Sequence, residues 1–140
     1  MEDKYEELLK EVDELAQIYD MTLPGWFREF FDYLFKKNQV IMYFDEDTNE
    51  LDGFICYWKY GKNRRKWIRD MDFLKENKFK QMTKGRNIYI PIALSRENGG
   101  PVGQVFDAIL KRNKDIDSIT WHTTDGQFVI HKTRGGNNGD

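Results

Sequence analysis

The sequence predicts a single α/β domain of mixed helices and strands, with a glycine-rich turn between a strand and a helix in its C-terminal half. The chain has 140 residues, the length of one ordinary domain. Apolar residues recur at helical spacing in some segments and in alternating or continuous runs in others, which is typical of helices and strands respectively. Aromatic residues make up 15% of the chain, which favours a packed core although 33% of the residues are charged.

Two helices are expected at the N-terminus. An apolar stripe at three- and four-residue steps covers residues 5–19, and residues 20–24 interrupt it. A second helix begins close to Pro24, because proline fits the first turn of a helix. Its stripe is the heaviest core element of the sequence and consists of Trp26, Phe27, Phe30, Phe31, Leu34 and Phe35.

Residues 40–44 and 51–60 are predicted to form a β-hairpin around a polar turn. The first run is continuously apolar, which is typical of a buried strand. In the second run Cys56 alternates with Phe54 and Trp58, so we expect this thiol to lie in the core. A chain with one cysteine forms no internal disulfide, and this suits a reducing compartment.

The segment 61–86 has weak periodicity. The pattern allows a short helix with Trp67, Met71 and Leu74 on one side, followed by an ordered loop over residues 75–85.

A strand over residues 87–94 is expected to place Ile88, Ile90, Ile92 and Leu94 on one face. Pro91 lies inside it, and because proline has no N–H, we expect the strand to bulge or lose a neighbour there. The C-terminal part then predicts a helix, a strand, a turn and a strand, over residues 101–112, 117–122, 123–126 and 127–132. The domain would span residues 1–134, with 135–140 as a flexible tail.

Residues 95–103, Ser-Arg-Glu-Asn-Gly-Gly-Pro-Val-Gly, join the strand to the helix. The unpaired N–H groups and the dipole at a helix start suit a phosphate or diphosphate, and glycines let a ligand approach the backbone. A tight strand-to-helix turn without a ligand explains the same residues equally well. The loop lacks the Lys-Ser or Lys-Thr of a Walker motif, and it does not match the dinucleotide fingerprint.

The order helix, helix, hairpin, bulged strand, glycine turn, helix, strand resembles the GNAT family of N-acetyltransferases, over residues 5–122. The diphosphate loop of that family reads Arg/Gln-x-x-Gly-x-Gly/Ala, and residues 98–103 fall on it. Asn98 then replaces the arginine or glutamine, Pro101 replaces the first glycine, and Gly103 keeps the last. The sequence departs from the family after residue 122, where a hairpin replaces the helix that often carries a tyrosine acid.

The resemblance implies an acyl-CoA-dependent N-acyltransferase with acetyl-CoA as co-substrate and an amine as acceptor. The pantetheine arm would pair with the bulged strand, and the loop would hold the diphosphate. The implied cofactor-binding residues are Ile92, Ala93, Leu94, Asn98, Gly99, Gly100, Val102 and Gly103.

The candidate catalytic residues are His122 and Glu97. His122 ends the strand beside the expected opening and has an ordinary pKa that suits a general base. A polar residue at a strand end is the structural alternative for His122, and a water-facing side chain is the alternative for Glu97. Tyr89 would serve as an acid toward the thiolate if it faced the opening. No histidine or cysteine spacing predicts a metal site.

Charge is segregated along the chain. Residues 1–20 hold eight acidic and two basic residues, whereas residues 59–86 hold eleven basic and three acidic ones. Cations interleave with aromatic residues over 59–69, as a surface for nucleic acid would require. An acidic protein, the 3′-phosphate of the coenzyme, or a solvated loop paired with the first helix are the alternatives.

Three functions follow as hypotheses: the acyltransferase, an inactive protein of the same fold, and a nucleic-acid-binding module that uses residues 59–86. The worn glycine motif and terminal hairpin are similar to GNAT-like products of bacteriophages, which implies an accessory or structural protein, a homo-oligomer or a virion assembly partner. The sequence has no apolar run long enough to span a membrane. We expect a cytoplasmic protein, in the host cell if a phage encodes it, with the virion as the alternative.

Overall fold

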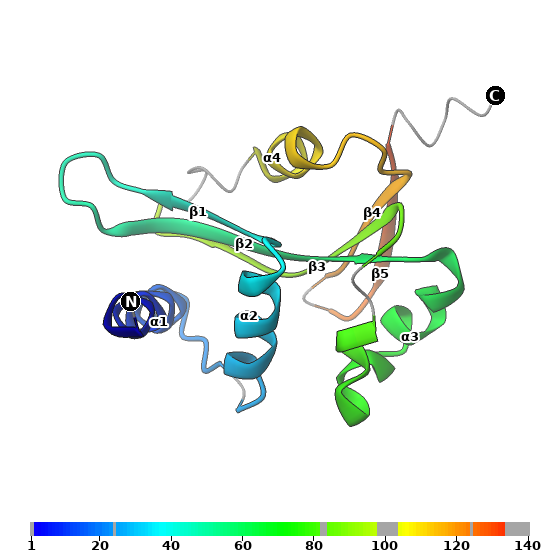
Figure 1. Ribbon diagram of the computed structural model, residues 1–140, viewed down its shortest axis with the longest axis horizontal. Helices are drawn as coiled ribbons and strands as arrows, with labels where there is room; N and C mark the ends of the chain where they lie inside the picture. The colour runs from blue at the N-terminus through cyan, green and yellow to red at the C-terminus, as the bar shows by residue number, and fades with distance from the viewer. Residues whose placement is uncertain (1, 24, 82–83, 98–103, 124, 134–140) are drawn as a thin grey trace.

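The computed structural model describes residues 2–23, 25–81, 84–97, 104–123 and 125–133 of the chain. A mixed five-stranded sheet forms its centre, and helices cover both faces (Figure 1). The elements are α1 (Glu2–Gln17), α2 (Phe27–Lys36), β1 (Val40–Phe44), β2 (Leu51–Tyr60), η1 (Lys62–Arg64), α3 (Arg65–Arg69), η2 (Asp72–Gln81), β3 (Asn87–Ser95), α4 (Val105–Arg112), β4 (Ser118–His122) and β5 (Phe128–Lys132). The mixed α/β class predicted from the sequence is confirmed.

The strands lie in the order β1-β2-β3-β4-β5, the same as their order in the chain. Neighbouring strands run antiparallel except β3 and β4, which run parallel. Parallel neighbours need a crossover connection, and α4 supplies it. Both the N-terminal hairpin and the C-terminal hairpin therefore form as predicted.

Two apolar clusters hold the layers together. The larger one joins α1, α2, α3 and η2 to one face of the sheet, and the smaller one joins α4 to the opposite face (Figure 1). Cys56 lies in the larger cluster with Phe54 and Trp58, as predicted. Burial raises the pKa of this thiol well above its usual range, which keeps it protonated.

The aromatic stripe of α2 is narrower than the sequence indicates. Phe27, Phe30, Phe31 and Leu34 are buried, whereas Trp26 precedes the helix and Phe35 lies at the rim, with exposed fractions of 40% and 36%. β1 also differs from the prediction of a buried strand. It lies at the edge of the sheet, and Phe44 at its end is 44% exposed.

Pro91 interrupts β3 as predicted. Two residues of β3, Ile90 and Pro91, lie opposite the single residue Tyr57 of β2. This two-against-one arrangement is a β-bulge, which bends a strand and adds to its twist.

The bulge reverses which side chains of β3 share a face. Ile88 and Ile90 pack with the α4-side cluster, whereas Ile92 and Leu94 pack with the larger cluster on the other face. The prediction that these four residues share one face is therefore wrong, because an extra residue shifts the alternation by one from that point onward.

The segment after β2 folds as η1, α3 and η2 instead of one helix followed by a loop. Met71 has a φ of 61°, a left-handed conformation that ends α3, and its side chain is exposed. Ile68, Phe73 and Phe79 are buried in its place. The prediction that Met71 belongs to the apolar side is wrong, because helical periodicity does not continue through a left-handed residue.

Candidate functional site

The sheet opens beside the bulge. β3 pairs with β4 only from Asn87 to Ile90, and in the described part of the chain the rest of β3 pairs with β2 alone. The opening arises because β4 ends at His122 and the chain turns back into β5. One backbone edge of β3, from Pro91 onward, therefore has no strand beside it.

A hollow of about 340 Å³ lies at this opening. Its size is at the lower end of the range of about 300–1,000 Å³ that is usual for small-molecule sites. The walls come from β3, α4 and the end of β4, and they are mostly apolar. The lining residues are Ile90, Pro91, Ile92, Ala93, Val105, Phe106, Trp121 and His122.

Aromatic contacts hold the wall opposite β3. The ring of Phe106 on α4 lies 5.4 Å from the ring of Trp121 on β4 and stacks at 4.8 Å on His131 of β5. His131 is exposed, and its ring covers one side of Phe106. These contacts fix the distance between α4 and the terminal hairpin, so the hollow is preformed.

Two of the predicted cofactor-binding residues lie at this hollow. Ile92 and Ala93 line it, whereas Leu94 packs against the larger cluster on the other side of the sheet. Ala93 and Leu94 lie on opposite faces because side chains alternate along the strand, whereas Ile92 shares the face of Leu94 and reaches the hollow because it lies next to the bulge. The other predicted residues lie outside the part of the chain that the structure describes. They are Asn98, Gly99, Gly100, Val102 and Gly103, and Pro101 lies in the same segment.

His122 lies at the end of β4, and each of its two ring nitrogens makes a hydrogen bond within the protein. Its Nε2 is 3.1 Å from the carbonyl oxygen of Arg69, and its Nδ1 is 2.8 Å from the hydroxyl of Tyr89. A carbonyl only accepts, so Nε2 carries the hydrogen. In the neutral ring Nδ1 then accepts from Tyr89. His122 thus joins β4 to β3 and to the end of α3.

Tyr89 is buried among rings and does not line the hollow. Its ring stacks on Trp58 at 6.3 Å and meets Phe73 edge-on at 5.4 Å. Burial raises the pKa of Tyr89 above its usual range, so the phenol keeps its proton and donates to His122. The condition for Tyr89 to act on a thiolate, a side chain facing the opening, is not met.

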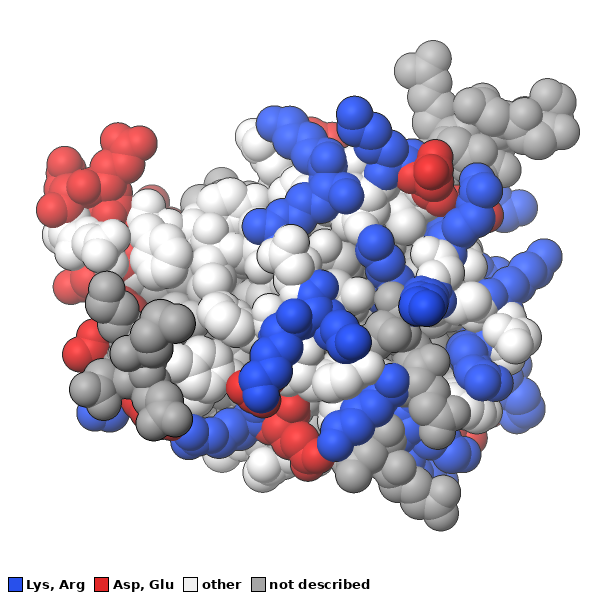
Figure 2. All heavy atoms as spheres, viewed as in Figure 1, with Lys and Arg blue, Asp and Glu red and all other residues white. Residues whose placement is uncertain are grey.

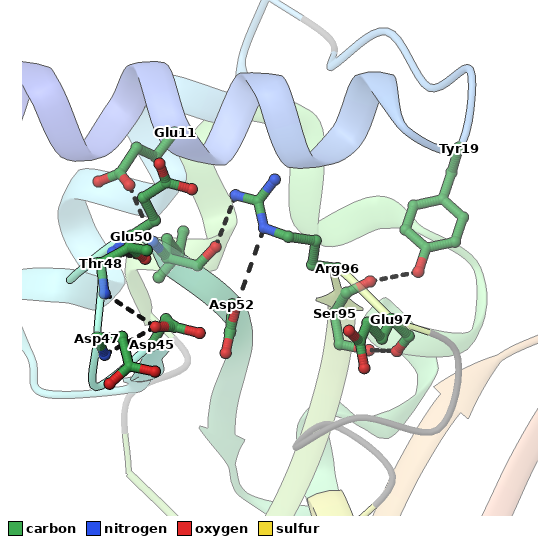
Figure 3. A network of polar contacts seen from close by, with 11 residues as sticks. Glu11, Tyr19, Asp45, Asp47, Thr48, Glu50, Asp52, Ser95, Arg96 and Glu97 are labelled. Carbon is green, nitrogen blue, oxygen red and sulfur yellow. Dashed lines mark hydrogen bonds and ion pairs between the residues drawn. The ribbon is translucent and has the colours of Figure 1, made fainter.

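Glu97, the second catalytic candidate, is exposed and is not among the lining residues. Its backbone carbonyl accepts a bond of 2.7 Å from the hydroxyl of Ser95 (Figure 3). In the described part of the chain Glu97 makes no hydrogen bond or ion pair with His122, which lines the hollow.

A polar network fixes the end of β3 where the glycine loop begins (Figure 3). The hydroxyl of Tyr19, just after α1, donates to the carbonyl of Ser95. The Arg96 guanidinium donates to the carbonyl of Leu51 at 2.9 Å, and the Arg96 amide bonds to the carbonyl of Asp52 at 2.6 Å. Glu11 of α1 accepts from the Leu51 amide. The first helix and β2 therefore both hold the entry to the loop.

Several of these residues carry no signal in the sequence. Tyr19 bonds to Ser95, 76 residues away in the chain, and Arg96 bonds to Leu51, 45 residues away. Local sequence patterns therefore do not mark them. Phe106 and Trp121 are ordinary apolar residues of a helix and a strand until the fold places them at the hollow. Among the described residues, no group of three or more His, Cys, Asp or Glu side chains is placed to hold a metal ion.

Comparison of the chain with family models, with curated proteins and with solved structures found no match. The described part of the chain also contains no helix that is both long and apolar enough to cross a membrane.

Proposed function

We propose that this protein binds an acyl-CoA at the hollow between β3 and β4 and transfers the acyl group to an amine. The observation that supports this most is that, in the described part of the chain, no strand pairs with β4's side of β3 from Pro91 onward, and that this edge lies beside a mostly apolar hollow. A pantetheine arm has amide groups that can pair with a strand edge, and its thin chain suits a narrow apolar site.

The order of the elements supports the position of the remaining coenzyme. The network around Arg96 fixes the end of β3, and residues 98–103 follow it in the sequence and precede α4. Backbone N–H groups before a helix attract phosphate, so the diphosphate would bind there while the thioester enters the hollow. Ile92 and Ala93 would contact the arm.

In the proposed reaction the amine nitrogen attacks the thioester carbonyl carbon. The C–S bond breaks, the acyl group stays on nitrogen, the amine loses one proton, and the coenzyme leaves as a thiol after gaining one. His122 is the proposed acceptor of the proton, at Nδ1. To accept it, His122 must exchange its bond with the Tyr89 hydroxyl.

A binding measurement tests the first half of the proposal. Acetyl-CoA should raise the melting temperature of the protein, and Ala93→Trp should abolish this rise because the indole fills the hollow. Ile130→Trp on β5 is the matched control, since Ile130 is 43% exposed and does not line the hollow. Absence of a shift at millimolar acetyl-CoA in the folded wild type would refute acyl-CoA binding.

A thiol-release assay with a panel of amines tests the second half. Wild type should release coenzyme A in the presence of an acceptor, and His122→Gln should lose at least about tenfold in rate while still binding the coenzyme. An unchanged rate in His122→Gln would remove the proposed base.

The contacts of His122 favour a second candidate, a non-catalytic coenzyme-binding module. Both ring nitrogens are bonded within the protein, which is the arrangement of a histidine that fixes α3 to β4. Binding of acetyl-CoA with no thiol release for any amine would support this candidate over the acyltransferase.

A further inference from the structure

We infer that the surface formed by η1, α3, η2 and Lys84 before β3 binds the phosphate backbone of a nucleic acid. This inference is independent of the acyl-CoA proposal. It concerns the basic surface, defined here by Lys62, Arg64, Lys66, Arg69, Lys78 and Lys84, of which all but the half-buried Arg64 and Lys78 are exposed.

The charges of the molecule are separated in space as well as in sequence. Acidic side chains gather around the β1–β2 turn, and basic side chains spread over the opposite end and over α4 (Figure 2). Within the described residues, the ion pair of α1 runs to Arg28 of α2, and none joins α1 to the basic surface. The first helix therefore does not neutralise this surface within the same chain.

Part of the surface has no counter-charge. Asp70 pairs with Lys66 at 2.7 Å and lies 3.8 Å from Arg69. In contrast, the side chains of Lys62 and Lys84 form no ion pair or hydrogen bond in the described part of the structure. Solvated, unpaired cations are available to an anion at little cost in desolvation.

Two further cations share one aromatic ring. The guanidinium carbon of Arg64 lies 4.2 Å, and the ammonium nitrogen of Lys78 lies 4.8 Å, from the ring centre of Trp67. Each cation is attracted to the ring, but the two repel each other, and no carboxylate among the described residues pairs with either. Both cations are therefore without a carboxylate partner in the described part of the chain, and each can donate to phosphate oxygens.

The same contact indicates how the nucleic acid is recognised. The Trp67 ring holds two of these cations by cation–π contacts, so its contribution to the surface is to position charge. Recognition would therefore depend on phosphates and not on bases, which predicts weak dependence on sequence and strong dependence on salt.

A second copy of this chain is a weaker occupant. Its acidic end would have to bind the basic surface, but two carboxylates at that end already accept hydrogen bonds within the chain. Asp45 accepts from the amides of Asp47 and Thr48, and Glu11 accepts from the Leu51 amide. These contacts would have to be kept or lost on binding, whereas nucleic acid phosphates carry no such cost.

The test is fluorescence anisotropy with a labelled single-stranded oligonucleotide at several salt concentrations. We expect binding at low salt that weakens as salt rises, with a log–log slope of roughly −0.7 for each phosphate contacted. Arg64→Gln/Lys78→Gln should reduce the affinity roughly tenfold and lower the magnitude of the slope. Lys62→Gln/Lys84→Gln should act in the same direction, and it removes no ion pair or hydrogen bond among the residues that the structure describes.

Lys111→Gln/Lys114→Gln is the matched control, because it removes one exposed cation of α4, which covers the opposite face of the sheet, and one in the turn just after α4. Its affinity should stay within about twofold of wild type, and circular dichroism should show all variants folded. No binding at low salt, or equal losses in the variants and the control, would overturn the inference. Salt-sensitive self-association in sedimentation, without oligonucleotide binding, would assign the surface to a second copy and also overturn it.

Discussion

The hydroxyl of Tyr89 lies 2.8 Å from Nδ1 of His122, and this bond joins β3 to β4 at the last residue of β4. It lies beside the point where the two strands stop pairing. The bond therefore holds the base of the opening that contains the hollow, whether or not His122 also moves a proton.

Tyr89→Phe should lower the free energy of unfolding by about 1 kcal/mol, because it removes one buried hydrogen bond and leaves Nδ1 without a donor. Urea denaturation of this variant and of Tyr43→Phe measures the effect. Tyr43 is half-buried, and its hydroxyl makes no hydrogen bond among the described residues. Tyr43→Phe should therefore leave the free energy of unfolding almost unchanged. Equal stabilities of the two variants would contradict the prediction.

Tyr89 also predicts a dependence of stability on alkaline pH. Burial raises its pKa in the folded state, whereas the unfolded chain titrates near the ordinary value of about 10. The stability that this group contributes is therefore fully present below that value and is lost as the pH rises toward the folded pKa. Alkaline unfolding monitored by tyrosinate absorbance should show a smaller slope in Tyr89→Phe than in wild type.

Deletion of Pro91 should leave the protein folded but close the hollow. Removing this one residue keeps Ile90 and Ile92 on the faces that they already occupy, and it removes the two-against-one mismatch with Tyr57. Acetyl-CoA should then no longer raise the melting temperature. Deletion of Ala93 is the control for removing a residue without removing the bulge. It would move Leu94 to the opposite face of the sheet and lower the free energy of unfolding by roughly 2 kcal/mol or more.

Arg65 predicts a stability effect remote from the hollow. Its guanidinium donates to Asn87 at 3.0 Å and to Ser118 at 3.1 Å, which ties α3 to the first residues of β3 and β4. Arg65→Met should cost about 2 kcal/mol in chemical denaturation, because charged hydrogen bonds to buried groups are lost. The neighbouring Lys66→Met removes only an exposed ion pair with Asp70 and should cost less than about 0.5 kcal/mol.

Gly85 is the position most sensitive to a methyl group. Its φ is 145°, a conformation that residues with a side chain rarely adopt, and an added Cβ would overlap the backbone carbonyl of Tyr60. Gly85→Ala should therefore destabilise by about 2 kcal/mol or more. A Cβ added at Gly25 would meet no atom within 4 Å. In thermal unfolding of both variants, Gly25→Ala should therefore have a melting temperature close to that of wild type.

The sequence predicts the larger elements because their patterns are local. The stripes of α1 and α2, the alternation of β2 and the proline inside β3 each depend on residues close together in the chain. The bulge at Pro91 is predictable for the same reason, since a missing N–H is a property of one residue.

The failures have a non-local cause. Whether Val40–Phe44 is central or at an edge depends on the order of strands in the sheet, which no local pattern contains. The side on which Leu94 lies depends on where the bulge adds its residue against β2. For the candidate site, Ile92, Ala93 and His122 line the hollow, but the contacts that occupy His122 come from Tyr89 and α3, which no local pattern contains.

The short pairing between β3 and β4 has a consequence for cooperativity. Four residue pairs are all the ladder that links β4–β5 to the rest of the sheet in the described residues. Side-chain bonds from Thr120 to the Ile88 carbonyl and from Ser118 to Asn87 reinforce that ladder. In native-state hydrogen exchange the terminal hairpin should open as a separate unit before the β1–β2–β3 meander, so a ligand in the hollow would also act as a clamp between two cooperative units.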